Sequence, residues 1–164
     1  MEIRKTQPSE LSAVMDIYAH ARKFMASTGN ATQWGDSWPP RELIESDIAA
    51  GKSRVCVDGD RILAVFFYDF GENAEPDYDV IYDGEWLGNG PYGCVHRIAT
   101  SSEGTGAGRF CLDWAFRQSG DLRIDTHENN KVMQHALTSL GFVYCGMVRV
   151  KEDTVPRMAF ERLG

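Results

Sequence analysis

The stretch that decides the fold runs from residue 99 to residue 109 and reads ATSSEGTGAGR. Gly104, Gly106 and Gly108 occupy every second position, where a strand-like run gives way to an apolar, helix-like one. Glycine permits positive φ and lets another molecule approach the backbone closely. Successive N–H groups of such a turn, together with the positive end of the following helix, attract phosphate oxygens. The pattern therefore predicts an anion site and does not by itself identify the ligand.

Two well-known phosphate motifs do not fit this turn. A dinucleotide-binding GxGxxG turn follows the first strand of a chain and precedes a long alternation of strands and helices, which this chain lacks. A Walker A loop carries Lys-Ser or Lys-Thr after its last glycine, where Arg109-Phe110 stands here. From the turn alone, a helix-entry turn without a ligand remains the alternative.

Hydrophobic spacing and turn residues predict the elements on either side of the turn. The expected strands cover residues 2–5, 54–57, 62–70, 93–100, 122–125, 142–150 and 156–161. The expected helices begin near Pro8, Arg41, Gly108 and Asn130 and run to about Ala26, Ala50, Ser119 and Leu140. Residues 29–40 are rich in turn formers and are expected to form a loop. This order predicts a mixed sheet with helices on both faces.

Length and composition fit one soluble domain over residues 1–164, with 43% hydrophobic and 25% charged residues. A net charge of −7 without Lys/Arg clusters argues against a nucleic-acid partner. The N-terminus, MEIRKTQPSEL, lacks the apolar core of a signal peptide, and no stretch has transmembrane length, so we expect a cytoplasmic protein without a membrane partner. The four cysteines have no zinc-site spacing, so no metal is expected.

The densest run of carboxylates is the acidic segment, residues 72–85, which also contains Tyr78 and Tyr82. A solvated loop is the favoured interpretation of such a charge run. A site for cationic substrates is the alternative.

The turn and the order of elements resemble the GNAT-type N-acetyltransferases, whose acetyl-CoA loop has the pattern Gln/Arg-x-x-Gly-x-Gly/Ala. That pattern falls on residues 103–108. A second family signature, an Asn followed by a helix and then Gly-Phe, is similar to Asn130 through Gly141-Phe142. The segments HRIA (96–99), DTHENNK (125–131) and QWG (33–35) resemble a bacterial branch whose members mostly lack an assigned acceptor. The resemblance covers nearly the whole chain.

The resemblance implies an α+β fold with three α/β/α layers, in which a mixed, mostly antiparallel sheet has splayed central parallel strands. It implies transfer of an acetyl group from acetyl-CoA, without a metal, to a primary amine of a small metabolite or peptide, and it leaves a homodimer open. The CoA-binding positions that it implies are Ile98, Ala99, Thr100, Glu103, Gly104, Thr105, Gly106, Ala107, Gly108, Arg109, Asn130 and Met133.

The chain departs from the family pattern at three points. Glu103 replaces Gln or Arg, so an anionic side chain stands beside the expected pyrophosphate and only its backbone is expected to make a contact. The turn is about two residues shorter than the common form on its strand side. Leu137 occupies the position where many members carry a Tyr as general acid, so that role must pass to another group or to water.

Acetyl transfer requires a neutral amine, a stabilised oxyanion and a proton for the departing thiolate. His96, on the strand that feeds the turn, is the first candidate base because its ordinary pKa is near neutral. Strand alternation would place it on one face with Ile98. A histidine hydrogen-bonded inside the sheet is an equally good interpretation.

Asp125 and His127, at the end of the next strand, are alternative bases, although Asp125 could instead orient a neighbour or bind Arg123. Tyr144 is a candidate to protonate the thiolate, and a half-buried sheet tyrosine is the favoured interpretation of that residue.

Several residues expected to bind CoA or the acceptor could instead have a purely structural role. Backbone N–H groups near residues 98–100 are expected to stabilise the oxyanion. Asn130 binds the pantetheine arm by resemblance, or caps a helix. Trp34, Trp38 and Trp86 are candidates for lining the acceptor pocket, or cover loops.

Two other functions remain open at this stage. Leu137 and Glu103 favour a CoA-binding sensor or interaction module that lost the chemistry. A protein-modifying acetyltransferase would need an open groove, which an acceptor site closed by residues 34–38 would oppose.

Overall fold

Seven strands form one sheet in the order β1-β2-β3-β4-β5-β7-β6 in the computed structural model, which describes residues 1–164. The strands are β1 (Glu2–Lys5), β2 (Ser53–Asp58), β3 (Arg61–Gly71), β4 (Tyr92–Thr100), β5 (Asp121–Thr126), β6 (Val143–Val148) and β7 (Arg157–Leu163). All neighbouring strands pair antiparallel except β4 and β5, which are parallel.

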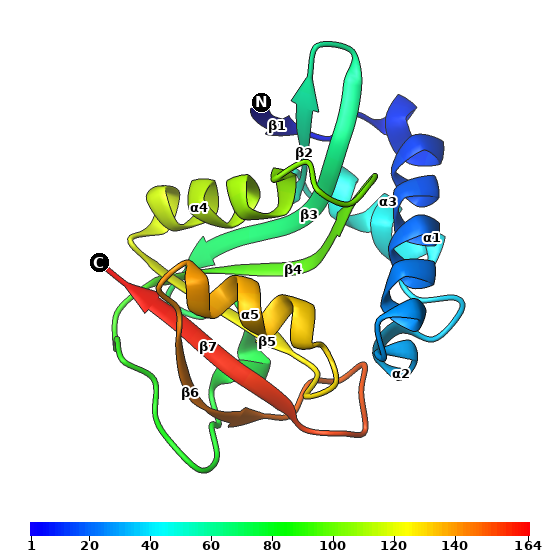
Figure 1. The fold of residues 1–164 in the computed structure, drawn as a ribbon. Coiled ribbons are helices and arrows are strands. Elements are labelled where there is room, and N and C mark those ends of the chain that lie inside the picture. The colour runs from blue at the N-terminus through cyan, green and yellow to red at the C-terminus, as the bar shows by residue number, and fades with distance from the viewer.

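The helices lie on both faces of this sheet (Figure 1). They are α1 (Leu11–Ser27), α2 (Ala31–Trp34), α3 (Arg41–Ala49), α4 (Ala107–Ser119) and α5 (Lys131–Ser139), with single 3₁₀ turns η1 (Pro8–Glu10) and η2 (Pro76–Tyr78). The predicted loop at residues 29–40 therefore contains a short helix, α2, which the turn-rich composition concealed. The other predicted elements are present with small shifts at their ends.

Three hydrophobic clusters hold the layers together. The largest joins α4 and α5 to one face of the sheet and includes Phe66 and Leu137. A second joins α1 and α3 to the opposite face of β2 to β4 and includes Val14 and Val65. A third packs residues of the segment before β4, such as Tyr78, under the C-terminal strands. The predicted three-layer α+β fold is confirmed.

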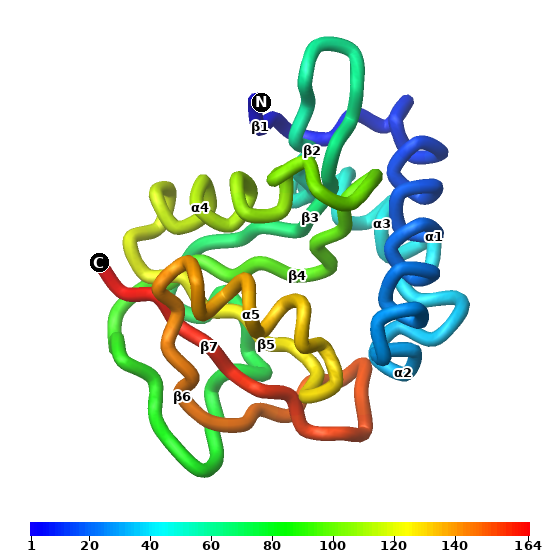
Figure 2. Tube along the Cα trace, in the orientation of Figure 1, coloured from blue at the N-terminus to red at the C-terminus, as the bar shows by residue number.

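The parallel strands β4 and β5 part soon after they meet. Their pairing consists of Gly93 with Leu122 and Cys94 with Arg123, although both strands continue. The tube in Figure 2 shows the two strands running apart beyond this point. The splayed central strands are thus present, and β4 beyond Cys94 has no sheet partner on its β5 side.

A β-bulge interrupts β4 at Arg97. Val65 pairs with Ala99 and Phe67 pairs with His96, so β4 has one more residue than β3 between these pairs, and Arg97 has φ of 52°. The Tyr18 hydroxyl donates to the Arg97 carbonyl oxygen at 2.9 Å. The bulge is therefore tied to α1 by its backbone.

The side chain of Arg97 anchors the bulge to α3. Its guanidinium donates to the two carboxylate oxygens of Asp47 at 2.9 to 3.1 Å, and both side chains are largely buried. Arg97 also lies over the ring of Phe67, 4.7 Å from its centroid. Contacts with two helices thus hold a backbone conformation that a non-glycine residue rarely adopts.

The bulge makes the expected alternation along β4 wrong. Ile98 packs against the cluster under α4, whereas His96 lies on the other face, with its ring centroid 5.5 Å from that of Phe67 and 5.9 Å from that of Tyr78. His96 and Ile98 therefore do not share a face.

Asp47→Ala should lower the free energy of unfolding by about 3 kcal/mol, because it leaves the buried Arg97 cation without its partner. Urea denaturation measures the loss. Glu45→Ala is the control on the same helix, since the Glu45–Arg41 pair is exposed and its loss should cost no more than about 0.5 kcal/mol. Equal losses of unfolding free energy in the two variants would show that the buried Arg97–Asp47 pair stabilises the fold no more than an exposed ion pair does.

Candidate active site

A cavity of about 400 Å³ follows the opening between β4 and β5. Its wall is built by α1, the segment around α2, β4, the glycine turn, α4, β5, α5 and the β6–β7 loop (residues 149–156). Most of the predicted residues line it, namely Trp34, Trp38, His96, Ile98, Ala99, Thr100, Glu103, Gly104, Thr105, Gly106, Ala107, Gly108, Arg109, Asp125, Asn130 and Met133.

The glycine turn forms one end of this cavity. Gly104 and Gly106 have φ of 79° and 76°, and a Cβ added to either would meet no atom within 4 Å. Gly106 is the N-cap of α4, so the positive end of that helix begins at the turn. Arg109, in the first turn of α4, also lines the cavity and donates to the hydroxyl of Ser139 on α5. This end is open and suited to an anion.

The carboxylate of Glu103 is held on α1. Its Oε1 lies 2.9 Å from Nε2 of His20, and both side chains are partly exposed. The negative charge that replaces the family's Gln or Arg thus has a cationic partner whenever His20 is protonated. The turn is fastened to α1 by the same contact.

Asn130 sits where the cavity passes between β5 and α5. Its Oδ1 accepts from the N–H of Met133 at 3.1 Å, so it caps α5, and its Nδ2 donates to Oε1 of Gln33 at 3.3 Å. Thr126, also in the cavity wall, is 1% exposed and its hydroxyl has no hydrogen-bond partner. A buried hydroxyl without a partner costs about 1 to 3 kcal/mol, which a polar ligand would recover. The opening therefore fits a ligand with hydrogen-bonding groups along its length, such as the pantetheine arm of CoA.

His96 lies between two carboxylates at the middle of the cavity. Its Nε2 is 3.3 Å from Oε1 of Glu75, and its Nδ1 is 3.9 Å from Oδ2 of Asp125. Burial lowers the pKa of His96, but hydrogen bonds with Cys94 and Glu75 and the charge of Asp125 outweigh it and raise that pKa to about 10. The raised pKa of His96 favours the protonated imidazole at neutral pH.

Asp125 is fixed by Tyr78 and Arg157. The Tyr78 hydroxyl donates to Oδ2 of Asp125 at 2.6 Å, and Nη1 of Arg157 donates to Oδ1 at 3.1 Å. Burial and the charge of Asp125 raise the pKa of Tyr78 well above its ordinary value, so Tyr78 stays a neutral donor. The alternative pairing of Asp125 with Arg123 is wrong, because Arg123 bonds Glu161 at 3.0 Å instead.

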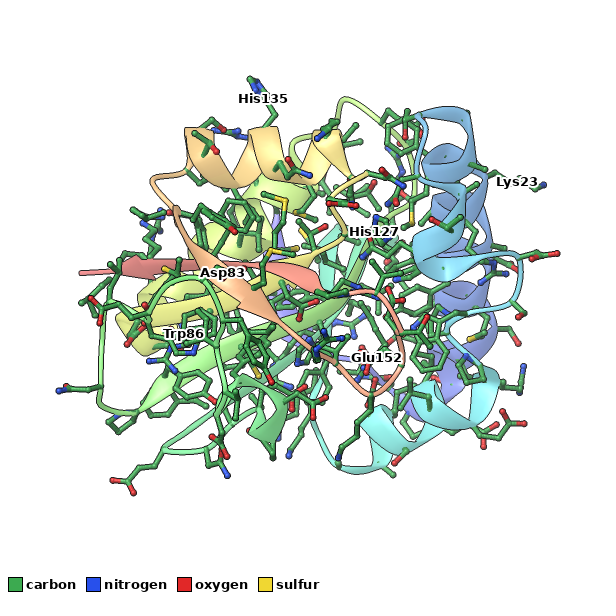
Figure 3. All side chains as sticks on the ribbon, turned by 90° about the horizontal axis from the view of Figure 1, so that it is seen from below. Lys23, Asp83, Trp86, His127, His135 and Glu152 are labelled. Carbon is green, nitrogen blue, oxygen red and sulfur yellow. The ribbon has the colours of Figure 1, made fainter.

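Two of the three predicted tryptophans line the end of the cavity away from the glycine turn. Trp34 and Trp38 lie there with Phe24 and Met25 of α1. The prediction for Trp86 is wrong, since its indole N–H donates to the Tyr78 carbonyl and it is not in the cavity wall. Figure 3 shows Trp86 on the opposite side of the molecule from α1 and α2.

His127 and Tyr144 also lie outside the cavity wall. His127 is buried, and its Nδ1 accepts from the N–H of Asn129 at 3.0 Å, so it shapes the segment before α5. Tyr144 is 47% exposed and packs edge-on against Phe160. Leu137 is fully buried in the core under α5, so no side chain takes the place of the family's Tyr from that position.

Sequence reasoning missed three residues of the site. Glu75 belongs to the acidic segment, whose favoured interpretation was a solvated loop, yet it folds against His96. Gln33 accepts hydrogen bonds from Asn30 and Asn130 and so links the segment around α2 to α5. Glu152 lines the cavity from the β6–β7 loop. Gln33 had a signal as part of the QWG segment that resembled the bacterial branch, and Glu75 had one in the alternative interpretation of the acidic segment as a site for cationic substrates.

Comparison with known proteins agrees with this geometry, although no family model and no curated protein matches the chain. An acetyltransferase of the GNAT family from Streptococcus agalactiae superposes with a TM-score of 0.87 and 34% identity, over 99% of this chain and 95% of that one. The chain belongs to the GNAT family of acetyltransferases.

More distant acetyltransferases share the fold. The ribosomal-protein-alanine N-acetyltransferase of Brucella melitensis has a TM-score of 0.64 and 16% identity, with full coverage of both chains. The Salmonella typhimurium protein yncA, solved with its cofactor acetyl-CoA, has a TM-score of 0.63 and 13% identity over 99% of this chain and 92% of that one.

Two further observations concern metal-binding groups and membrane-spanning helices. No group of three or more His, Cys, Asp or Glu side chains is arranged to hold a metal ion. None of the helices combines the length and the apolar composition that crossing a bilayer demands.

Proposed function

We propose that residues 1–164 form a single acetyltransferase domain that moves the acetyl group of acetyl-CoA to a primary amine of a small metabolite or peptide. Membership of the GNAT family supplies the acetyl transfer. The observation that carries the rest is the continuous cavity, with the glycine turn at one end, His96 in its middle and an acidic, indole-lined end beyond.

The proposal assigns the CoA contacts to the residues that line the first half of the cavity. Backbone N–H groups at Gly104 and Gly106, with the N-terminus of α4, bind the pyrophosphate. The backbone of β4 at residues 98–100, which has no sheet partner on its β5 side, and the Thr126 hydroxyl bind the pantetheine arm. Bound there, acetyl-CoA supplies the thioester that an amine attacks.

In this reaction His96 is the proton donor. As the C–N bond forms and the C–S bond breaks, N–H groups of β4 stabilise the charge on the carbonyl oxygen. The His96 imidazolium then donates its proton to the departing thiolate and regains one from the newly bonded nitrogen, directly or through water. This role replaces that of the tyrosine which Leu137 displaces, and the raised pKa of His96 supports it.

The first test is amine-dependent release of CoA thiol. Purified protein mixed with acetyl-CoA should release thiol when primary amines are added, and mass spectrometry should show the acetylated amine. Thiol reagents follow the rate. Tight CoA binding without release by any amine or peptide would support a CoA-binding sensor and overturn the proposed function.

Gly106→Ala should weaken CoA binding by at least about tenfold, because the new methyl group occupies space that the pyrophosphate needs. Isothermal titration calorimetry measures the affinity. Gly59→Ala is the matched control, since Gly59 also has positive φ and open space but lies in the β2–β3 turn outside the cavity wall. Both variants should lose about 1 kcal/mol of stability from backbone strain. Similar CoA affinity in the two would refute the assigned phosphate site.

The rate should be insensitive to pH through the neutral range and should fall as the pH approaches 10, when the acceptor is an amine already neutral at pH 7. The sign follows from the raised pKa of His96: the donor form exists below that pKa and disappears as the pH rises through it. His96→Gln should lower kcat by about 100-fold and remove the alkaline fall. His135→Gln, an exposed position on α5, is the control. A rate that instead rises with pH around 6.5 would make His96 a base.

A further inference from the structure

The two ends of the cavity differ in charge. The glycine end is lined by Arg109 and by the positive end of α4. The opposite end is bounded by α1, the segment around α2 and the β6–β7 loop, and Figure 1 shows that loop beside α2, well away from the glycine turn. Glu152 on this loop contributes a carboxylate there.

The acceptor end has an excess of negative charge. Its ionised wall residues, together with their ion-pair partners, comprise three cations and five carboxylates, which leaves two negative charges uncompensated. The cations are His96, Arg97 and Arg157, and the carboxylates are Asp47, Glu75, Asp125, Glu152 and Asp153. Such an excess in a cleft attracts cationic ligands.

Glu152 accounts for one of the two negative charges. It makes no hydrogen bond or ion pair, whereas its neighbours on both sides are fixed: the Lys151 N–H donates to Asp77, and Asp153 binds Arg157 at 2.8 Å. Figure 3 shows Glu152 on the side of the molecule where α1, α2 and α3 lie. The backbone on both sides of Glu152 is thus fixed, and its exposed, unpaired carboxylate lines the cavity.

The indoles provide the second feature of this end. Trp34 is braced edge-on against Tyr18, with ring centroids 5.8 Å apart, and the Trp38 carbonyl accepts from Arg22 at 3.2 Å. Indole faces attract cations, and with Phe24 and Met25 they also accommodate a hydrocarbon chain.

We infer that the acceptor is a small aliphatic diamine, whose second positive charge is bound by Glu152 and the indoles of Trp34 and Trp38 while the first amine is acetylated beside His96. This inference rests on the proposed function, because it names the acceptor class of that site. A monoamine would fill the apolar part of the cavity and leave Glu152 without a partner.

The experiment compares matched pairs of acceptors that differ only in the distal amine, terminal diaminobutane against n-butylamine and terminal diaminopentane against n-pentylamine. The kcat/KM for each diamine should exceed that for its monoamine by at least about tenfold. Glu152→Gln should bring this ratio close to one. Glu42→Gln is the control for loss of one exposed carboxylate outside the cavity, and it should keep the ratio of the unmodified protein.

Equal kcat/KM within a pair, or a diamine preference that survives Glu152→Gln, would overturn the inference while leaving amine acetylation in place. If neither kind of amine is acetylated while another amine or a peptide is, the inference fails and the proposed function stands; if no acceptor is acetylated, the proposed function fails. Calorimetry of diaminobutane with the CoA-bound protein then tests the diamine site independently of turnover. Binding that Glu152→Gln weakens supports the inferred site, and absence of binding overturns it.

Discussion

The site depends on the way β4 leaves the sheet. After Cys94 this strand has no partner on its β5 side, so backbone groups that a sheet normally satisfies are available to a ligand. The bulge at Arg97 then separates the directions of His96 and Ile98. One strand therefore exposes a backbone edge on one side of the cavity and directs an imidazole to the other face of the sheet, which is what the proposed roles of β4 and His96 require. Tyr18 and Asp47 hold the bulge from α1 and α3, so the helices on that face fix the direction in which His96 points.

The charges around His96 follow from the same arrangement. Glu75, Asp125 and Arg157 come from separate parts of the chain and meet His96 where the strands part. Burying ionised groups is costly unless each has a partner, and here pairing is complete only when the imidazole is protonated. The cluster therefore favours a proton on His96, which supports the proposed role of His96 as proton donor in a chain whose usual tyrosine position is filled by the core residue Leu137.

Local patterns in the sequence were sufficient for most of the fold and for the glycine end of the site. Turn glycines and hydrophobic spacing act over a few residues, so the helix α4 and its entry turn could be located directly. The bulge could not be predicted, because Arg97 is held at positive φ by Asp47 and Tyr18, which are separated from it by 50 and 79 positions along the chain. The positions of Glu75 and Trp86 could not be predicted for the same reason. Folding of the acidic segment and its neighbours brings Glu75 to His96 and places Trp86 over Arg123.

The charge distribution of the acceptor end also bears on how a free amine reaches the thioester. Carboxylates near an amine raise its pKa and so oppose attack, whereas a nearby cation lowers it. In this cavity the unpaired carboxylate, Glu152, lies on the β6–β7 loop, while the protonated His96 lies where β4 and β5 part. Glu75 and Asp125 offset the charge of His96, so the contrast between the two places lies in pairing: the carboxylates at His96 already have partners, whereas Glu152 is available to an ammonium group. The separation of the two groups would thus orient the inferred diamine, with the nitrogen held by Glu152 kept away from the opening between β4 and β5 and the other nitrogen placed to react.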